Sequence, residues 1–185
     1  SLKTLVNEFS TFARLPEIQQ TPDDLNSIVL EAVNLFRAAH EKVHFEVAIE
    51  EELPRLSLDR AQLRRVLINL FDNAVSAMAG EGTISVSTEH DKTEGLYRVS
   101  VADEGCGIDS GAYSQLFEPY FSTKQGGTGL GLAIVQRIVA DHGGFVRASS
   151  NKPRGTRFTI EFPESLKVDK RTIQMAGFAE DSQWS

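Results

Sequence analysis

Two asparagines in an apolar segment are the first residues that could do chemistry. Asn69 and Asn73 stand four residues apart, so in a helix they lie on one face, one turn apart. Asparagine is a mediocre helix former, and a solvent-facing stripe or bonds from side chain to backbone would explain the pair structurally. The functional alternative is that an amide oxygen binds a magnesium ion that carries phosphates. Mg²⁺ keeps several of its waters, so it needs few protein ligands.

An aspartate followed by two glycines comes directly after a predicted strand. Residues 103–107 read Asp-Glu-Gly-Cys-Gly. A carboxylate accepts a hydrogen bond from an exocyclic amine such as that of adenine, and glycines let a flat ligand approach the backbone closely. Taken alone, the motif is more typical of a tight turn than of a nucleotide site.

A second glycine-rich run, residues 126–132 (Gly-Gly-Thr-Gly-Leu-Gly-Leu), precedes a predicted helix. Backbone N–H groups at the start of a helix bind phosphate, and the helix dipole favours the negative charge. A dinucleotide-binding fold would place such glycines after its first strand, with an acidic residue about 20 positions later. Here a long irregular loop precedes them, and the P-loop pattern is absent. Both of these common nucleotide folds are therefore disfavoured.

The segment between the two glycine runs is rich in aromatic residues. Residues 116–124 read Leu-Phe-Glu-Pro-Tyr-Phe-Ser-Thr-Lys. The aromatic rings could anchor a mobile flap, and Lys124 could reach a phosphate as a point charge. The structural alternative is a surface loop with buried aromatics.

Hydrophobic periodicity predicts the elements that must position these motifs. An N-capping Asp59 opens a long helix that runs to about Met78. Further helices are expected after the start signal at residues 21–24 and at residues 129–141, with strands at residues 43–49, 83–89, 97–103, 145–149 and 156–162. This order predicts an α+β fold, a two-layer α/β sandwich in which about three helices cover one mixed sheet of about five strands.

The ends of the chain are predicted to lie outside this sandwich. Residues 1–14 carry an apolar stripe at helical spacing, and Pro16 ends it. This helix either packs on its own domain or belongs to a bundle completed by other sequence or by a second chain. We therefore divide the chain into residues 1–16, a domain at 17–163, and a polar tail or linker at 164–185.

Composition narrows the classes of function. The 185 residues are 41% hydrophobic and 24% charged, and the formal net charge of -7 disfavours a nucleic-acid groove. The single cysteine, Cys106, can form no internal disulfide, and we assign it no redox role. The sequence has no run of membrane-spanning length and no signal peptide, so we expect a cytoplasmic fragment of a longer protein, whether or not the parent is anchored in the inner membrane.

The order of the motifs resembles that of sensor histidine kinases. The asparagine helix, Asp103-x-Gly105-x-Gly107, the aromatic segment and the second glycine run are similar to the N, G1, F and G2 boxes of that family. Gly155-Thr156-x-Phe158 is similar to its last, G3-like turn. The resemblance covers residues 59–162 and implies the Bergerat ATP-binding fold that the family shares with gyrase, HSP90 and MutL.

The resemblance assigns roles to individual residues. Asn73 would be the magnesium ligand, Asn69 would lie close to the phosphates and Lys124 would contact phosphate. Asp103 would bind the adenine amine, with Thr156 beneath the base. The full set that it implies for ATP is Asn69, Asn73, Ala77, Asp103, Gly105, Gly107, Ile108, Phe117, Tyr120, Lys124, Gly127, Thr128, Gly129, Leu130, Gly131, Leu132 and Thr156. Asn69 and Lys124 would serve the transfer step.

The identity of Asn69 separates subfamilies. ATP-hydrolysing relatives usually carry a water-activating glutamate at this place, and an amide is no useful general base. The resemblance therefore implies slow hydrolysis and transfer of the γ-phosphoryl group to a histidine. Leu5 to Pro16 resembles the end of the second dimerisation helix of nitrogen-regulation-type kinases, which are homodimers.

The expected phosphoacceptor is not in this sequence. Its H-E-x-x-N-P-like box is absent, and none of the four histidines has such neighbours. The implied partners are therefore the phosphoacceptor histidine helix of the parent kinase and a response regulator receiver domain. Two alternatives remain: a serine kinase of the anti-sigma type, and a non-catalytic binding module that uses a degenerate nucleotide pocket to switch partners.

Overall fold

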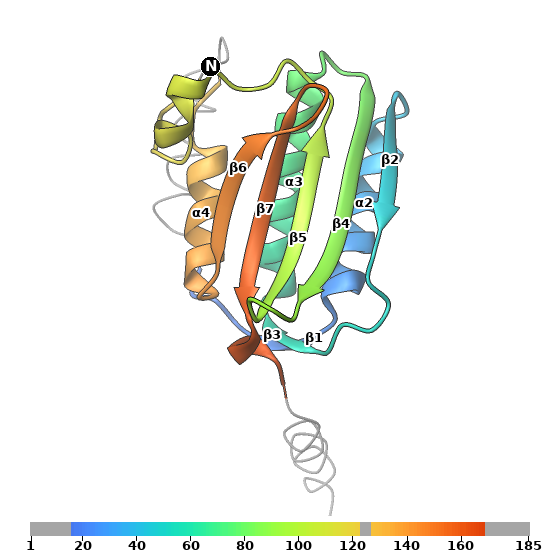
Figure 1. Cartoon of the computed structure of the whole chain (residues 1–185), viewed down its shortest axis with the longest axis vertical. Helices are drawn as coiled ribbons and strands as arrows, with labels where there is room; N and C mark the ends of the chain where they lie inside the picture. Colours follow the sequence, from blue (N-terminus) through green and yellow to red (C-terminus); the bar gives the residue numbers. More distant parts are fainter. Residues whose placement is uncertain (1–15, 123–126, 169–185) are drawn as a thin grey trace, which may run out of the picture.

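A mixed five-stranded sheet forms one layer of the domain. The computed structural model describes residues 16–122 and 127–168. The strand order is β2 (Val43–Ala48), β4 (Gly82–Asp91), β5 (Leu96–Asp103), β7 (Thr156–Pro163) and β6 (Phe145–Ser150). β2 runs parallel to β4, and the other pairs are antiparallel (Figure 1). The predicted sheet is confirmed.

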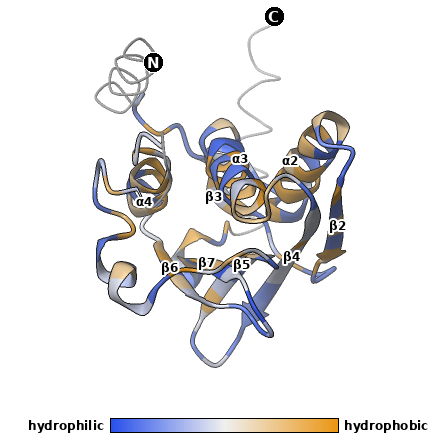
Figure 2. Ribbon diagram, turned by 90° about the horizontal axis from the view of Figure 1, so that it is seen from above, coloured by the Kyte–Doolittle hydropathy of each residue, from blue (hydrophilic) through white to orange (hydrophobic). Residues whose placement is uncertain are grey.

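Three helices form the second layer. α2 (Leu25–Ala39), α3 (Arg60–Ala77) and α4 (Gly131–Asp141) lie side by side on one face of the sheet, as Figure 2 shows from above. α3 occupies the centre of this layer, with α4 on the side of β6 and α2 on the side of β4. The predicted two-layer α+β fold is confirmed, whereas the predicted N-terminal helix and the tail after residue 168 lie outside the described residues.

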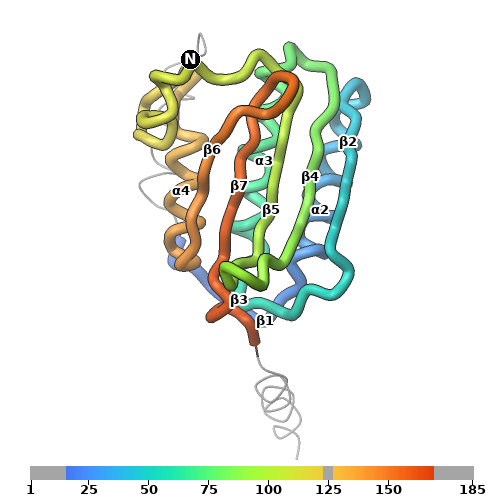
Figure 3. The backbone as a smooth tube through the Cα atoms, in the orientation of Figure 1, coloured from blue at the N-terminus to red at the C-terminus, as the bar shows by residue number. Residues whose placement is uncertain are grey.

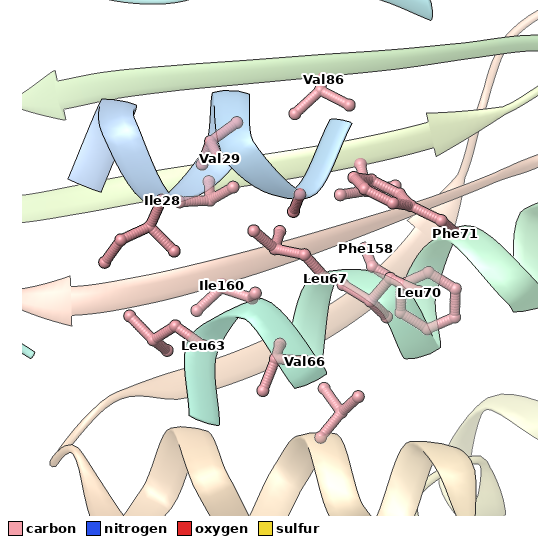
Figure 4. Packing of buried hydrophobic residues seen from close by; sticks show 14 of the residues in the cluster. Ile28, Val29, Leu63, Val66, Leu67, Leu70, Phe71, Val86, Phe158 and Ile160 are labelled. Carbon is pink, nitrogen blue, oxygen red and sulfur yellow. The ribbon is translucent and has the colours of Figure 1, made fainter. Parts of the chain in front are cut away.

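The core lies between the two layers. Its members come from the 3.6-residue stripe of each helix and from alternate residues of each strand, which is why the periodicity located the elements. Figure 4 shows the centre of this cluster, with labels on Ile28, Val29, Leu63, Val66, Leu67, Leu70, Phe71, Val86, Phe158 and Ile160. Packing on both sides therefore fixes α3, the helix that carries the two asparagines.

Side-chain caps set the starts of two helices. The carboxylate of Asp59 accepts a hydrogen bond from the Gln62 N–H at 3.1 Å, and that of Asp24 accepts one from the Ser27 N–H at 3.2 Å. The predicted cap of the long helix is therefore confirmed.

Some short elements were not expected. β1 (Thr21–Asp23) and β3 (Leu56–Leu58) pair as a small antiparallel sheet, and 3₁₀ helices occupy Ser110–Gln115 and Glu164–Leu166. Three residues are too few for an alternating pattern to be visible in a sequence. The Val168 N–H donates to the Arg55 carbonyl at 2.9 Å, so the last described residues lie against β3.

The topology gathers the candidate motifs at one end of the sandwich. The end of β5, the end of α3 and the turn between β6 and β7 meet at the top of Figure 3, where the loop that leads to α4 also begins. No helix in the described part of the chain is long and apolar enough to span a membrane.

Candidate nucleotide-binding site

A buried aspartate is held rigidly at the end of β5. Asp103 is only 3% exposed. Its Oδ1 accepts hydrogen bonds from the Gly105 N–H at 2.8 Å and the Thr156 N–H at 3.2 Å. Its carbonyl oxygen accepts a third from Asn151 Nδ2 at 2.9 Å. The carboxylate therefore has a fixed orientation, and the structure brings Asp103 and Thr156 together as the family resemblance implied.

Two glycines permit close approaches around this aspartate. A Cβ atom on Gly155, whose φ is +105°, would lie 1.9 Å from the Asp103 carbonyl oxygen. A Cβ atom on Gly105 would lie 2.6 Å from the Cβ of Ala77, and the Cys106 N–H donates to the Ala77 carbonyl at 3.1 Å. Only glycine fits at either place. These contacts join the loop after β5 to the last turn of α3.

The two asparagines lie on the side of α3 that leads toward α4. Both are partly buried, so they do not form a solvent-facing stripe. The Nδ2 of Asn69 donates to the Arg65 carbonyl at 2.9 Å. This is a bond from side chain to backbone, one of the two structural explanations for the asparagine pair. Its Oδ1 lies 3.1 Å from where a Cβ atom on Gly131 would stand. Asn69 therefore connects α3 to the first residue of α4.

The N-cap residue of α4 makes no side-chain capping bond. Leu130 occupies the N-cap position and makes no capping hydrogen bond through its side chain. The first N–H groups of a helix have no partner within the helix, so this terminus can bind an anion. Leu130 is itself fully buried in the core, so any contact it makes with a ligand would come from its backbone.

The aromatic segment lies against the second glycine run. The Tyr120 N–H donates to the Gly129 carbonyl at 3.0 Å, and a Cβ atom on Gly129 would lie 2.4 Å from the Tyr120 carbonyl carbon. The ring of Phe117 packs edge-on against Phe158, with 6.4 Å between centroids, whereas Tyr120 is 55% exposed. One aromatic thus anchors the segment to the core and another projects from it. Lys124 lies outside the described residues.

The predicted site residues therefore form two groups. The first group lies at the end of β5 and consists of Asp103, Gly105, Thr156 and Ala77. Gly107 belongs to it as well, because a Cβ atom on Gly107 would lie 3.6 Å from the Gly155 carbonyl oxygen. The second group lies at the start of α4 and consists of Asn69, Gly129 and Gly131. Asn73 stands one turn along α3 from Asn69. Asn151 was missed, because an asparagine before a turn gives no signal that its side chain will hold a distant strand.

The histidines of the chain have structural environments of their own. His142 is buried, donates from Nδ1 to the Ile138 carbonyl at 2.8 Å and accepts at Nε2 from the Asp59 N–H at 3.0 Å. His90 pairs with Glu164 at 2.6 Å, and His40 stacks on Phe36 with 4.0 Å between centroids. His44 is exposed on the edge strand β2. None of these partners belongs to the two groups of site residues.

Comparison with known proteins agrees with this geometry. Residues 58–166 match the family described as histidine kinase-, DNA gyrase B-, and HSP90-like ATPase. This match covers more than half of the chain. The chain therefore belongs to this family, as the order of its motifs predicted, and it carries the family's catalytic ATPase fold.

Sensor histidine kinases are among the proteins to which the chain is similar. It is 37% identical over 164 residues to the sensor histidine kinase ZraS of Klebsiella oxytoca, a match that covers 88% of the chain and 35% of ZraS. The structure of full-length ShkA in complex with AMPPNP matches with a TM-score of 0.76 and 34% identity, over 88% of this chain and 35% of that one. The histidine kinase ThkA in complex with the response regulator TrrA matches with a TM-score of 0.74 and 30% identity, over 88% of this chain and 47% of that one. The chain thus spans about a third of the length of ZraS.

Proposed function

We propose that this chain binds ATP with magnesium and transfers the γ-phosphoryl group to a histidine on a separate helix. The observation that carries the proposal is the position of Asn69 beside Gly131, where its Oδ1 lies 3.1 Å from where a Cβ atom on that glycine would stand. An amide therefore lies at the start of α4, whose N-cap residue makes no capping bond. The fixed carboxylate of Asp103 stands at the opposite end of the site. An adenine amine at Asp103 and phosphates at the start of α4 would use both ends.

Asn73 is the proposed magnesium ligand. Among the described residues, no three His, Cys, Asp or Glu side chains gather in a way that could hold a metal. A site with one amide oxygen suits Mg²⁺, because this ion is commonly bound through few protein oxygens together with substrate phosphates and waters. When bound, the ion would neutralise charge on the phosphates. Glycines 127, 129 and 131, with Thr128, would shape the phosphate end, and Lys124 would add a charge.

Asn69 protects ATP from water in this proposal. An amide takes up no proton near neutral pH, so it cannot act as general base for an attacking water molecule. It can still orient the phosphates by hydrogen bonding. Catalysis of the transfer then depends on positioning and on charge stabilisation rather than on activated water.

The acceptor is proposed to be a histidine other than the four in this sequence. His142 is buried, and His40 and His90 are engaged with neighbouring side chains. His44 lies on β2, at the edge of the sheet opposite β6. The proposed acceptor helix belongs to the dimerisation bundle of the parent kinase, a homodimer. We further propose a response regulator receiver domain as the protein that takes the phosphoryl group from it, in line with the complex of ThkA with TrrA.

A reconstituted transfer reaction tests the proposal. The chain is mixed with a separate helix-pair fragment that carries an acceptor histidine, magnesium and ATP labelled at the γ-phosphate. Label should appear on the helix fragment, be stable in base and be lost in acid. A helix fragment with the acceptor histidine changed to glutamine should stay unlabelled, and so should the chain on its own.

Each alternative function gives a different outcome. Acid-stable label on a partner serine would indicate the serine kinase. No binding of ATP in the presence of magnesium would indicate a non-catalytic module. Rapid steady-state release of phosphate without acceptor would show that Asn69 does not prevent hydrolysis.

A further inference from the structure

An arginine that has no partner among the described residues stands next to the proposed phosphate end. Arg65 lies on α3 one turn before Asn69, whose amide bonds to the Arg65 carbonyl. Its side chain is partly buried, and within the described part of the chain it makes no hydrogen bond or ion pair. Burial lowers the pKa of its guanidinium, and no interaction with another described residue opposes this. A partly desolvated cation without a partner costs free energy, so it invites a functional explanation.

The neighbouring arginine, Arg64, differs from Arg65 because it has an ion-pair partner. Arg64 pairs with Glu31 of α2 at 2.6 Å. The two arginines differ by 100° in direction around the helix, because an α-helix turns once in about 3.6 residues. Arg64 therefore lies on the side of α2, whereas Arg65 leaves the helix about 100° further round, on the side where Asn69 leads toward α4.

The direction of the nucleotide places its terminal phosphate near Arg65. The base end is fixed by Asp103 beside Ala77, the last residue of α3, and the phosphate end by Asn69 beside Gly131. A nucleotide bound in this way runs along α3 from its C-terminal end toward its N-terminal end. The next turn on this path carries Arg65, at a rise of about 6 Å beyond Asn69.

We propose that Arg65 contacts the γ-phosphoryl group on its acceptor side and stabilises it during transfer. The inference rests on the proposed function. In the step, the lone pair of the neutral acceptor imidazole forms a P–N bond and the bond from the γ-phosphorus to the bridging oxygen breaks. That electron pair leaves with ADP, and the remaining ring proton is released to solvent. Arg65 donates N–H bonds to the phosphoryl oxygens as their charge redistributes, and it exchanges no proton itself.

The test is the transfer reaction above, run with Arg65→Gln and Arg65→Lys. Removing one preorganised donor of this kind typically lowers the rate constant of the chemical step by about 10²- to 10³-fold. We expect a loss of that size for Arg65→Gln, with the Kd for ATP changed by less than about 3-fold. Arg65→Lys should recover part of the rate, since an ammonium keeps the charge but not the planar fork.

The matched control is Arg64→Gln, which removes a neighbouring arginine whose partner is known. It should transfer at the wild-type rate, and thermal unfolding of all variants should show that each is folded. The inference is overturned if Arg65→Gln transfers normally, or if its loss is confined to the KM for the acceptor fragment, which would assign Arg65 to a carboxylate on that partner. If the wild type transfers no label in the same assay, the proposed function fails, whereas the outcomes above test Arg65 only when the wild type is active.

Discussion

The buried histidine at the end of α4 makes the stability of the domain depend on pH. His142 is 1% exposed, and its Nε2 accepts a hydrogen bond from the Asp59 N–H, so the ring is neutral. Burial lowers the pKa of His142 below its usual value of 6.5, and this outweighs the nearby carboxylates of Asp59 and Asp141. Protonation would place a second N–H against the N–H of Asp59 at the start of α3. Acid should therefore weaken the junction of the two helices.

The sign and the size of this pH dependence follow from how many protons His142 binds in the folded and unfolded states. In the unfolded chain His142 takes up a proton near pH 6.5, whereas in the fold it does so only at lower pH, so the unfolded state binds more protons in between. The stabilising contribution is complete above pH 6.5 and is lost as the pH falls toward the folded pKa. If the folded ring stays neutral throughout, lowering the pH from about 7.5 to 5.5 removes about 1.4 kcal/mol of unfolding free energy.

Urea unfolding of the wild type and of His142→Gln at several pH values measures this contribution. Glutamine does not titrate, so the variant should lack the part of the pH dependence that belongs to His142, whatever its stability at pH 7.5. His44→Gln, at an exposed histidine, should keep the wild-type dependence. Equal slopes for the wild type and His142→Gln between pH 7.5 and 5.5 would refute the assignment of a neutral buried ring.

Three further outcomes follow from the contacts around the site and the caps. Gly155→Ala should destabilise the domain by more than about 2 kcal/mol in urea unfolding, because the added Cβ would overlap the Asp103 carbonyl. Gly111→Ala is the control: its added Cβ would meet nothing within 4 Å, so the unfolding free energy should change by less than about 0.5 kcal/mol. Asp103→Asn should weaken ATP binding by 10-fold or more in calorimetry without unfolding the domain, and unchanged affinity would remove Asp103 from the base site. Asp59→Ala should cost about 1–2 kcal/mol, more than Asp24→Ala, because Asp59 is 8% exposed and also accepts a backbone N–H from the segment before β1.

Local patterns were sufficient to predict the layers of the fold. α3 was predicted from its cap and its apolar stripe, and both are properties of neighbouring residues. The strands of the large sheet were visible because each buries alternate residues on one face. β1 and β3 were not predicted, because a pairing of three residues depends on contacts across more than thirty positions rather than on local periodicity.

The site was predictable only in part, because its contacts join distant segments. Asp103 and Thr156 are 53 residues apart, and the register of β5 with β7 brings them together. Their association was expected from a family resemblance and not from spacing. Arg64 and Arg65 are indistinguishable in the sequence, and only the position of α2 decides that one of them is paired. The same limit applies to Asn151, whose bond to Asp103 spans 48 residues.

The two ends of the site differ in how strongly the fold determines them, and this difference suits a phosphoryl donor. At the proposed base end, three hydrogen bonds and a glycine contact fix Asp103, so binding there would require little reorganisation. At the proposed phosphate end, the described groups are the amide of Asn69, a helix start whose N-cap residue makes no capping bond, and Arg65, which has no partner among the described residues. Such an arrangement can hold ATP by its base while the stabilisation of the transferring group is completed only when an acceptor arrives. ATP bound in this way would persist in water, which is what a donor to a separate histidine requires.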